Sequence, residues 1–317
     1  MKFRSLCIIL IVLLLLGCAG KPTEKAVESG ENVTIKFGIL PIEDALPVVV
    51  AEKEGLFKKH GINVEIVKFN SALERDSALI AKEVDAVITD PLAIILLRSK
   101  GYDVRIVSLC LGKTPQEGVF AILASPNSSI NSIEDLNGKK IAISSNTIIE
   151  FVTDMLLSRY NVSYEKVEVK KIPLRLRMLL DNEIDAATLP EPLASYAVSK
   201  GAKLIISDAM VNESLTQTVI AFRGDFIRKH DDAVKKFLEA YAEAVEMINN
   251  DPQKYRSLFV EIARVPKDIA DSYPMPKYPK PEKFPKEFYD RYLNWALQKG
   301  LIEREIPYSE AVYDIGQ

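Results

Sequence analysis

The chain has 317 residues, of which 48% are hydrophobic, and this length and composition suit one large or two medium globular domains with buried cores. Its 41 basic and 44 acidic residues leave a net charge of −3 and are interspersed along the chain. Because no basic stripe is present to neutralise phosphates, we do not expect nucleic acid as a partner.

The first twenty residues depart from this even composition. Lys2 and Arg4 precede an uninterrupted apolar run from Leu6 to Leu16, which has about half the length that a bilayer-spanning helix needs. A charged start, a short apolar stretch and a small-residue exit are typical of a secretory signal, so we expect residues 1–17 to be a signal peptide. An uncleaved membrane anchor is the alternative, and with either the body lies outside the cytoplasm.

Residues 18–33 begin with Cys18 and continue with charged residues, Gly, Ser and Pro but no hydrophobic periodicity, which predicts a flexible tether. Cys7 leaves with the signal, so Cys110 is the one cysteine expected in the folded body, and no disulfide is predicted there. Cys110 ends an apolar run, which favours a small core residue over a reactive thiol.

From Thr34 onward, short β-rich runs alternate with helical patterns, which is typical of βα units around mostly parallel sheets. Ser71 and Glu74 form a capping-box pattern at the start of one helix, and Asp90 followed by Pro91 places an N-cap directly after a strand. The first set comprises predicted strands at residues 35–40, 62–69, 86–89 and 104–109 and helices at 45–53, 71–82 and 91–100.

A second, similar set follows, with predicted strands at 119–124, 140–144, 167–171, 186–189 and 204–207 and helices at 147–160, 174–181 and 193–200. After a strand at 218–222, apolar residues at i, i+3, i+4 and i+7 from Val234 to Ile248 predict a core-facing helix that ends at Asp251-Pro252. Five prolines at 273–285 predict an extended connector, with a partner-binding strip as the alternative, before a last helix that contains Trp295.

Four phrases in the body together resemble a known family. They are AEKEGLFKKHGI (51–62), VITDPLA (87–93), SIEDLNGKKIAIS (132–144) and DAATLPEPLA (185–194). In their order and spacing they resemble the periplasmic solute-binding proteins of the nitrate, taurine, aliphatic-sulfonate and thiamine-precursor ABC importers. The end of the apolar run, LLGC (15–18), resembles the lipobox of bacterial lipoproteins, which implies that Cys18 is lipidated.

This resemblance implies a two-lobe Venus-flytrap α/β fold in which each lobe is a mostly parallel sheet flanked by helices. The chain would cross between the lobes near residues 113–118 and 208–217. Lobe one would then comprise residues 34–115 plus 216–317, and lobe two residues 116–215.

In open α/β sheets, ligands bind outside the carboxyl ends of strands, where helix N-termini point free N–H groups at the ligand. This rule selects the loops after four predicted strands, and we expect these loops to line one cleft. The candidate ligand-binding residues are Pro41, Ile42, Glu43, Asp44, Thr89, Asp90, Ser144, Ser145, Asn146, Thr147 and Glu191.

Most candidates also have a purely structural interpretation. The hydroxyls, amide and helix N-terminus of residues 144–147 suit a carboxylate, sulfonate or ring acceptor, but Asn146 alone could simply cap the helix. Glu43 and Asp44 could favour a helix N-terminus through its dipole, and Asp90 is already an N-cap. Glu191 lies between two prolines in a turn that, by resemblance, faces the cleft; a structural use is the alternative.

Four acidic side chains at one cleft disfavour a simple oxyanion such as nitrate, because unpaired like charges would repel it. An amine, amidine or aminopyrimidine group fits better. We therefore expect a monomeric protein, anchored outside the cytoplasm through its lipid, that captures an amine-bearing sulfonate or an aminopyrimidine-like solute and delivers it to an ABC permease.

Catalysis is not predicted. His60 and His230 lack ligand-type neighbours at metal spacing, and neither a nucleophile elbow nor a phosphate-binding glycine loop occurs, so no metal and no cofactor are expected. The fold also hosts enzymes, including pyrimidine-precursor synthases and menaquinone-pathway dehydratases, so an enzyme remains one alternative. A ligand-sensing ectodomain of a signalling complex is the other.

Overall fold

The computed structural model describes residues 33–211 and 213–314. The predicted signal peptide, the predicted lipidation site Cys18 and the tether up to residue 32 lie outside these residues. Within the described ranges, no helix is long and apolar enough to cross a membrane.

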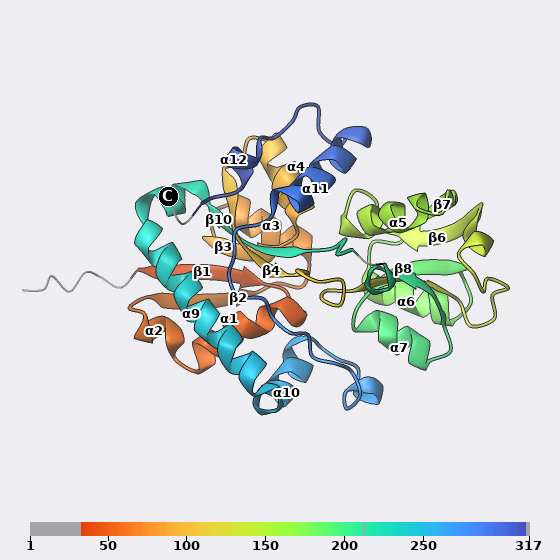
Figure 1. Cartoon of the computed structure of the whole chain (residues 1–317), viewed down its shortest axis with the longest axis horizontal. Helices are drawn as coiled ribbons and strands as arrows, with labels where there is room; N and C mark the ends of the chain where they lie inside the picture. Colours follow the sequence, from red (N-terminus) through yellow and green to blue (C-terminus); the bar gives the residue numbers. More distant parts are fainter. Residues whose placement is uncertain (1–32, 212, 315–317) are drawn as a thin grey trace, which may run out of the picture. The chain divides into compact units, whose positions relative to one another are not determined.

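The first sheet has five strands, and four of them run in one direction (Figure 1). β1 pairs in parallel with β2 and β3, whereas β10 is antiparallel to both β3 and β4. The order across the sheet is β2 (Asn63–Lys68), β1 (Thr34–Ile39), β3 (Ala86–Thr89), β10 (Thr218–Arg223) and β4 (Val104–Leu111). We call this sheet and its helices lobe one.

Helices cover both faces of this sheet, and a separate apolar core lies between the sheet and the helices on each face. One face carries α1 (Leu46–Lys53), α2 (Leu56–Lys59), α8 (Gly224–Lys229), α9 (Asp231–Asn250) and α10 (Pro252–Ile262). The other face carries α3 (Ala72–Ile80), α4 (Pro91–Ser99), α11 (Lys286–Gln298) and α12 (Tyr308–Ala311).

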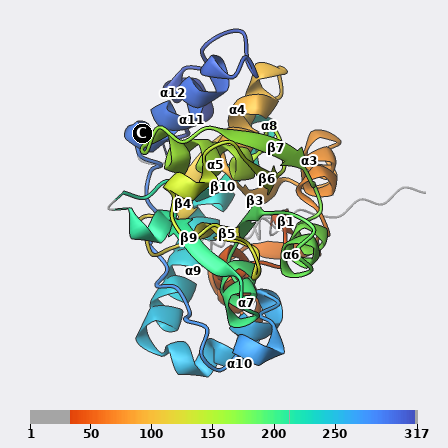
Figure 2. The same cartoon turned by 90° about the vertical axis from the view of Figure 1, so that its right-hand side faces the viewer.

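The second sheet repeats this plan, and we call it and its helices lobe two. Its order is β7 (Tyr164–Glu168), β6 (Lys139–Ile143), β8 (Ala186–Pro190), β5 (Phe120–Ala124) and β9 (Lys203–Ser207), with β5 as the antiparallel member. α5 (Ile148–Ser158) covers one face, and α6 (Ile172–Leu180) and α7 (Leu193–Ser199) cover the other (Figures 1 and 2). In both lobes the antiparallel strand is the one that enters from the other lobe.

Two segments link the sheets, residues 112–119 between β4 and β5 and residues 208–217 between β9 and β10. The Ser214 hydroxyl donates to the carbonyl of Gly112, and the Thr216 hydroxyl donates to the carbonyl of Gly118 at 3.0 Å. Gly112 has a φ of +93°, and a Cβ there would lie 2.1 Å from the carbonyl oxygen of Thr216, so only glycine fits. The boundaries predicted at 115/116 and 215/216 lie within these segments and stay a prediction.

Helix α11 ties lobe one to lobe two beside these segments. Tyr292 stacks on Phe151 of α5 with ring centroids 4.3 Å apart, and Trp295 Nε1 donates to Asp154 of α5 at 2.9 Å. The Tyr292 hydroxyl also accepts from the backbone N–H of Gln217 at 3.0 Å. The predicted last helix therefore packs on the body and also fixes the second link between the lobes.

The two-lobe α/β prediction is confirmed, and most predicted elements lie within a few residues of their observed bounds. The apolar stripe of α9 is buried, but Asp251-Pro252 also starts α10, because the Asp251 carboxylate accepts from the backbone N–H of Lys254 at 3.2 Å. Helices α2, α8, α10 and α12 were not predicted. The strand predicted at 167–171 is β7, three residues earlier, where it pairs residue by residue with β6.

Candidate functional site

The loop after β1 carries two acidic side chains into the interior. Glu43 and Asp44 are 7% and 3% exposed and form the start of a short 3-10 helix (Glu43–Ala45) without capping it. Burial raises the pKa of each carboxyl to about 7, since desolvation penalises the charged form. Helix-dipole stabilisation on a solvated surface therefore does not explain these two residues.

Two tyrosines from the proline-rich connector cover Glu43. The Tyr273 hydroxyl donates to the Glu43 carboxylate, and the Tyr278 hydroxyl donates to the Glu43 carbonyl at 2.8 Å. Both rings are buried. The connector (273–285) has neither helix nor strand, as predicted, but its aromatic side chains form part of the site, which was not predicted.

The cost of burying the Asp44 carboxyl is only partly offset by its neighbours. Its Oδ2 is buried and has no hydrogen-bond partner among the described residues. The nearby charge of Arg75 opposes the increase in its pKa. Arg75 is itself buried, and its guanidinium donates to the Thr89 hydroxyl at 2.7 Å. The site therefore includes a buried cation that was not predicted, and that cation already occupies the hydroxyl of Thr89.

Asp90 caps helix α4. Its carboxylate accepts from the backbone N–H of Ala93 at 2.9 Å, as predicted from the Asp-Pro pair. Burial raises its pKa. The structure thus gives Asp90 a structural use, while its charge remains close enough to Arg75 to interact with it.

In lobe two, residues 144–147 lead from β6 into α5, and two of their backbone N–H donors are already engaged. Ser145 N–H donates to Glu168 at 3.0 Å, and Asn146 N–H donates to Glu150 at 2.7 Å. The alternative in which Asn146 caps this helix is wrong. Asn146 has a φ of +60°, whereas an N-cap needs extended backbone, and Thr147 caps the helix by accepting from Ile149 N–H at 3.2 Å.

Glu191 in the turn after β8 lies half-buried at the start of α7. Its two carboxylate oxygens accept from the hydroxyl and the backbone N–H of Ser195, at 2.8 and 3.0 Å. Burial raises its pKa. Its charge also raises the pKa of Glu43 and of Tyr273, so this carboxylate of lobe two lies near the acidic loop of lobe one.

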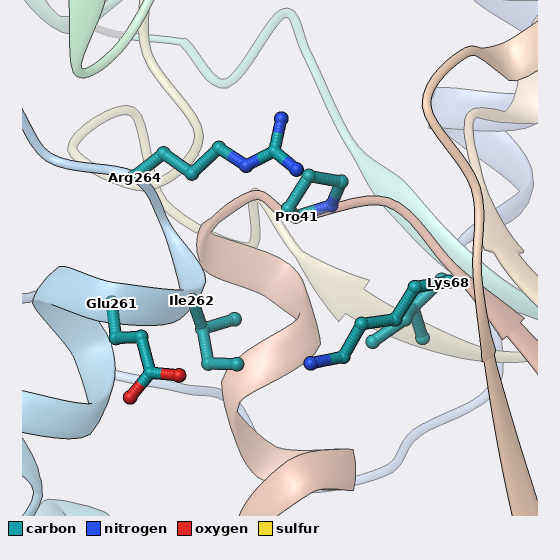
Figure 3. A pocket seen from close by; sticks show the side chains of 6 residues that line it. Pro41, Lys68, Glu261, Ile262 and Arg264 are labelled. Atoms are coloured by element: carbon teal, nitrogen blue, oxygen red, sulfur yellow. The ribbon is translucent and has the colours of Figure 1, made fainter.

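A pocket of about 210 Å³ adjoins this cluster in lobe one (Figure 3). Pro41 is the one predicted site residue among its lining residues. Ile42, the next residue, is 38% exposed. The pocket is lined by Ile39, Pro41, Lys68, Glu261, Ile262 and Arg264.

The site thus unites Glu43, Asp44 and Glu191 with the unpredicted Tyr273 and Tyr278. Thr89 and Asp90 connect to it through Arg75, and residues 144–147 form a separate loop on lobe two. Among the described residues, no group of three or more His, Cys, Asp or Glu side chains is arranged to hold a metal ion.

Known proteins are similar to this chain in sequence and in architecture. A protein of Brachyspira hyodysenteriae named as an ABC transporter periplasmic binding protein is 26% identical over 264 residues, 78% of this chain and 74% of that protein. One of Bacillus subtilis named as an aliphatic sulfonates-binding protein is 24% identical over 282 residues, 86% of this chain and 82% of that protein.

The crystal structure of the periplasmic aliphatic sulphonate binding protein SsuA from Escherichia coli superimposes with a TM-score of 0.77. It covers 90% of this chain and 93% of that one, at 16% sequence identity, which shows the shared two-lobe fold. The resemblance found in the sequence is thereby confirmed. The family model described as NlpA lipoprotein matches residues 35–262, so the chain belongs to the NlpA lipoprotein family.

Proposed function

We propose that the protein is a solute-binding protein of an ABC importer that holds a small amine-bearing solute between its two lobes and delivers it to the permease. The observation that carries this proposal is the approach of Glu43 on lobe one and Glu191 on lobe two, whose charges repel each other. A solute that satisfies both carboxylates would bind preferentially where the lobes meet. Binding, without chemistry, is then the function.

The preference for an amine follows from charge. Glu43, Asp44 and Glu191 all have raised pKa values, chiefly through burial, and a cation beside them would offset the cost of ionising them. An oxyanion at the Ser145–Asn146 backbone would have to displace Glu168 and Glu150, which already accept from those N–H groups. An amine-bearing sulfonate or an aminopyrimidine-like solute fits these acids better than nitrate.

The transport cycle would use differential contacts. A solute that contacts both lobes stabilises the arrangement in which they approach, and a permease that recognises this arrangement senses occupancy. The two linking segments, 112–119 and 208–217, are where the backbone would bend. The chain would act as a monomer.

An extracytoplasmic, lipid-anchored location is part of the proposal. The LLGC sequence at residues 15–18 supports lipidation of Cys18, and relatives named as periplasmic binding proteins support export. Labelling of cells with a radioactive fatty acid tests the anchor. Wild type should take up label and Cys18→Ala should not; equal labelling would refute lipidation at this residue.

Solute binding is tested on purified residues 19–317 by native mass spectrometry and thermal shift with 3-aminopropanesulfonate, an aminopyrimidine, nitrate and an aromatic acid. An amine-bearing compound should raise the melting temperature with a saturating dependence on its concentration. Glu191→Gln keeps the size of the side chain and should weaken this binding at least about tenfold. Stabilisation by nitrate alone would refute the amine class, and turnover of any compound would favour the enzyme alternative.

A further inference from the structure

The pocket of lobe one is lined by two cationic side chains that form no ion pair with another described residue. Lys68 is the last residue of β2, and Arg264 follows the end of α10. In Figure 3 their side chains extend over the pocket from different sides, Arg264 past Pro41 and Lys68 toward Ile262. Within the described part of the chain, neither side chain makes an ion pair or a hydrogen bond. We call this feature the Lys68–Arg264 pocket.

The backbone of Arg264 is in an unfavourable conformation. Its φ is +51°, in the left-handed region. Arg264 N–H donates to the carbonyl of Glu261, and Val265 N–H to that of Val260 at 3.1 Å, a helix-ending motif whose left-handed position is usually glycine. A side chain at this position strains the backbone, so glycine would suit the end of the helix better than arginine does.

A second cationic residue, Lys82, ends a helix in the same left-handed conformation as Arg264. Lys82 ends α3 in the same motif with a φ of +62°, but its amine pairs with Asp225 at 2.8 Å. Arg264 has the same backbone strain, but its guanidinium forms no ion pair within residues 33–211 and 213–314. Strained residues that gain nothing within the fold concentrate at ligand sites.

We propose that the Lys68–Arg264 pocket binds the singly charged oxyanion, a carboxylate or a sulfonate, of a solute whose amine reaches Glu43 and Glu191. This inference rests on the proposed function and adds the anionic end of the solute to it. Glu261 also lines the pocket, so its net charge is +1, which suits one negative charge. A volume of about 210 Å³ holds roughly seven waters at ~30 Å³ each, enough for such a group.

The pocket and the acidic loop are close along the chain, which favours a short solute. Pro41 lines the pocket and lies two residues before Glu43, so their Cα atoms are at most about 7 Å apart. An amine separated from its oxyanion by two or three carbon atoms spans a distance of this order. A bare amine would occupy the acidic subsite alone.

Calorimetry with purified residues 19–317 tests this inference. The probes are 3-aminopropanesulfonate, 3-aminopropanoate and 1-aminopropane, which has the same amine without an oxyanion. The variants are Lys68→Met and Arg264→Gly, with Lys82→Gly as the matched control. We expect each pocket variant to weaken binding of at least one amino-oxyanion about tenfold and to leave 1-aminopropane binding unchanged.

Thermal melting adds a second readout. Arg264→Gly and Lys82→Gly should each raise the melting temperature by about 2 °C through relief of strain, but only Arg264→Gly should lose affinity. Unchanged affinities in both pocket variants, or binding of the bare amine alone, would overturn the pocket and leave the proposed function standing. A wild type that binds none of the three probes would overturn the pocket, and the thermal shift with an aminopyrimidine would then decide the proposed function.

Discussion

The buried carboxyl of Glu43 should make the protein less stable as the pH rises. Its pKa is about 7 in the folded protein, against 4.5 for an unperturbed Glu. The folded state therefore holds this proton more tightly than the unfolded chain does, and unfolding releases it between these two values. The contribution to stability is present in full below pH 4.5, falls as the pH rises to about 7, and is flat above that.

The size of the effect follows from the shift. Each pKa unit corresponds to about 1.36 kcal/mol, so Glu43 contributes a decline of roughly 3 kcal/mol across this window. Glu43→Gln removes the titration and still accepts a hydrogen bond from Tyr273. We expect the variant to match wild type at low pH and to exceed its unfolding free energy by up to about 3 kcal/mol at pH 8.

Urea unfolding at constant ionic strength, from pH 4.5 to pH 8, measures this difference. The exposed residue Glu65 on β2 provides the control, because Glu65→Gln removes a carboxylate that is not buried and should leave the slope of wild type. If Glu43→Gln showed the same decline of stability with pH as wild type, Glu43 would be ionised in the folded protein, and the desolvation argument would be refuted.

Two further predictions concern stability. Arg175 is fully buried, donates only to the carbonyl of Val169 at 2.9 Å, and has Nε and Nη2 unpartnered within the described ranges; Arg175→Met should therefore raise the unfolding free energy by about 1–4 kcal/mol in urea titrations, and a loss would show that the charge is compensated. Thr147→Ala should cost about 1 kcal/mol by thermal melting because it removes the cap of α5, while no loss would show that this cap does not stabilise the protein.

Local patterns predicted the scaffold well. The Ser71 capping box and the Asp90-Pro91 pair mark the starts of α3 and α4 with residues that are neighbours in sequence. The apolar stripe of α9 indicates which face of that helix is buried. Such elements depend on neighbours in sequence. The positions of the acidic loop at the carboxyl end of β1 and of Glu191 at the end of β8 follow from the same βα pattern, by the rule for open sheets.

The covering of Glu43 could not be predicted in this way. Tyr273 and Glu43 are 230 residues apart, and no local spacing records a contact of that separation. The one available signal was tyrosine among the prolines of the connector, since an amphipathic ring in an extended segment tends to bury its body and place its hydroxyl on a polar partner. Arg75 was missed because an arginine in a helix usually lies in solvent.

The two lobes use one plan for different chemistry. DAVITDPLA (85–93) and DAATLPEPLA (185–194) share an aspartate-alanine start and an acid-Pro-Leu-Ala end, and they form the equivalent strands β3 and β8 with the turns that follow them. In both, the acid accepts from a backbone N–H of the next helix, from Ala93 or from Ser195.

The lobes differ in the loops that follow β1 and β6, the strands next to β3 and β8. After β1 the chain buries Glu43 and Asp44. After the equivalent strand β6 it carries polar residues, and the backbone N–H groups of Ser145 and Asn146 donate to glutamates of lobe two. A repeated acid-Pro turn therefore explains the helix starts, and selectivity has to come from the loops that do not repeat. Substitution of Glu43 or Asp44 in lobe one should change which solute is bound, whereas substitution of Asp90 should mainly change the stability of the protein.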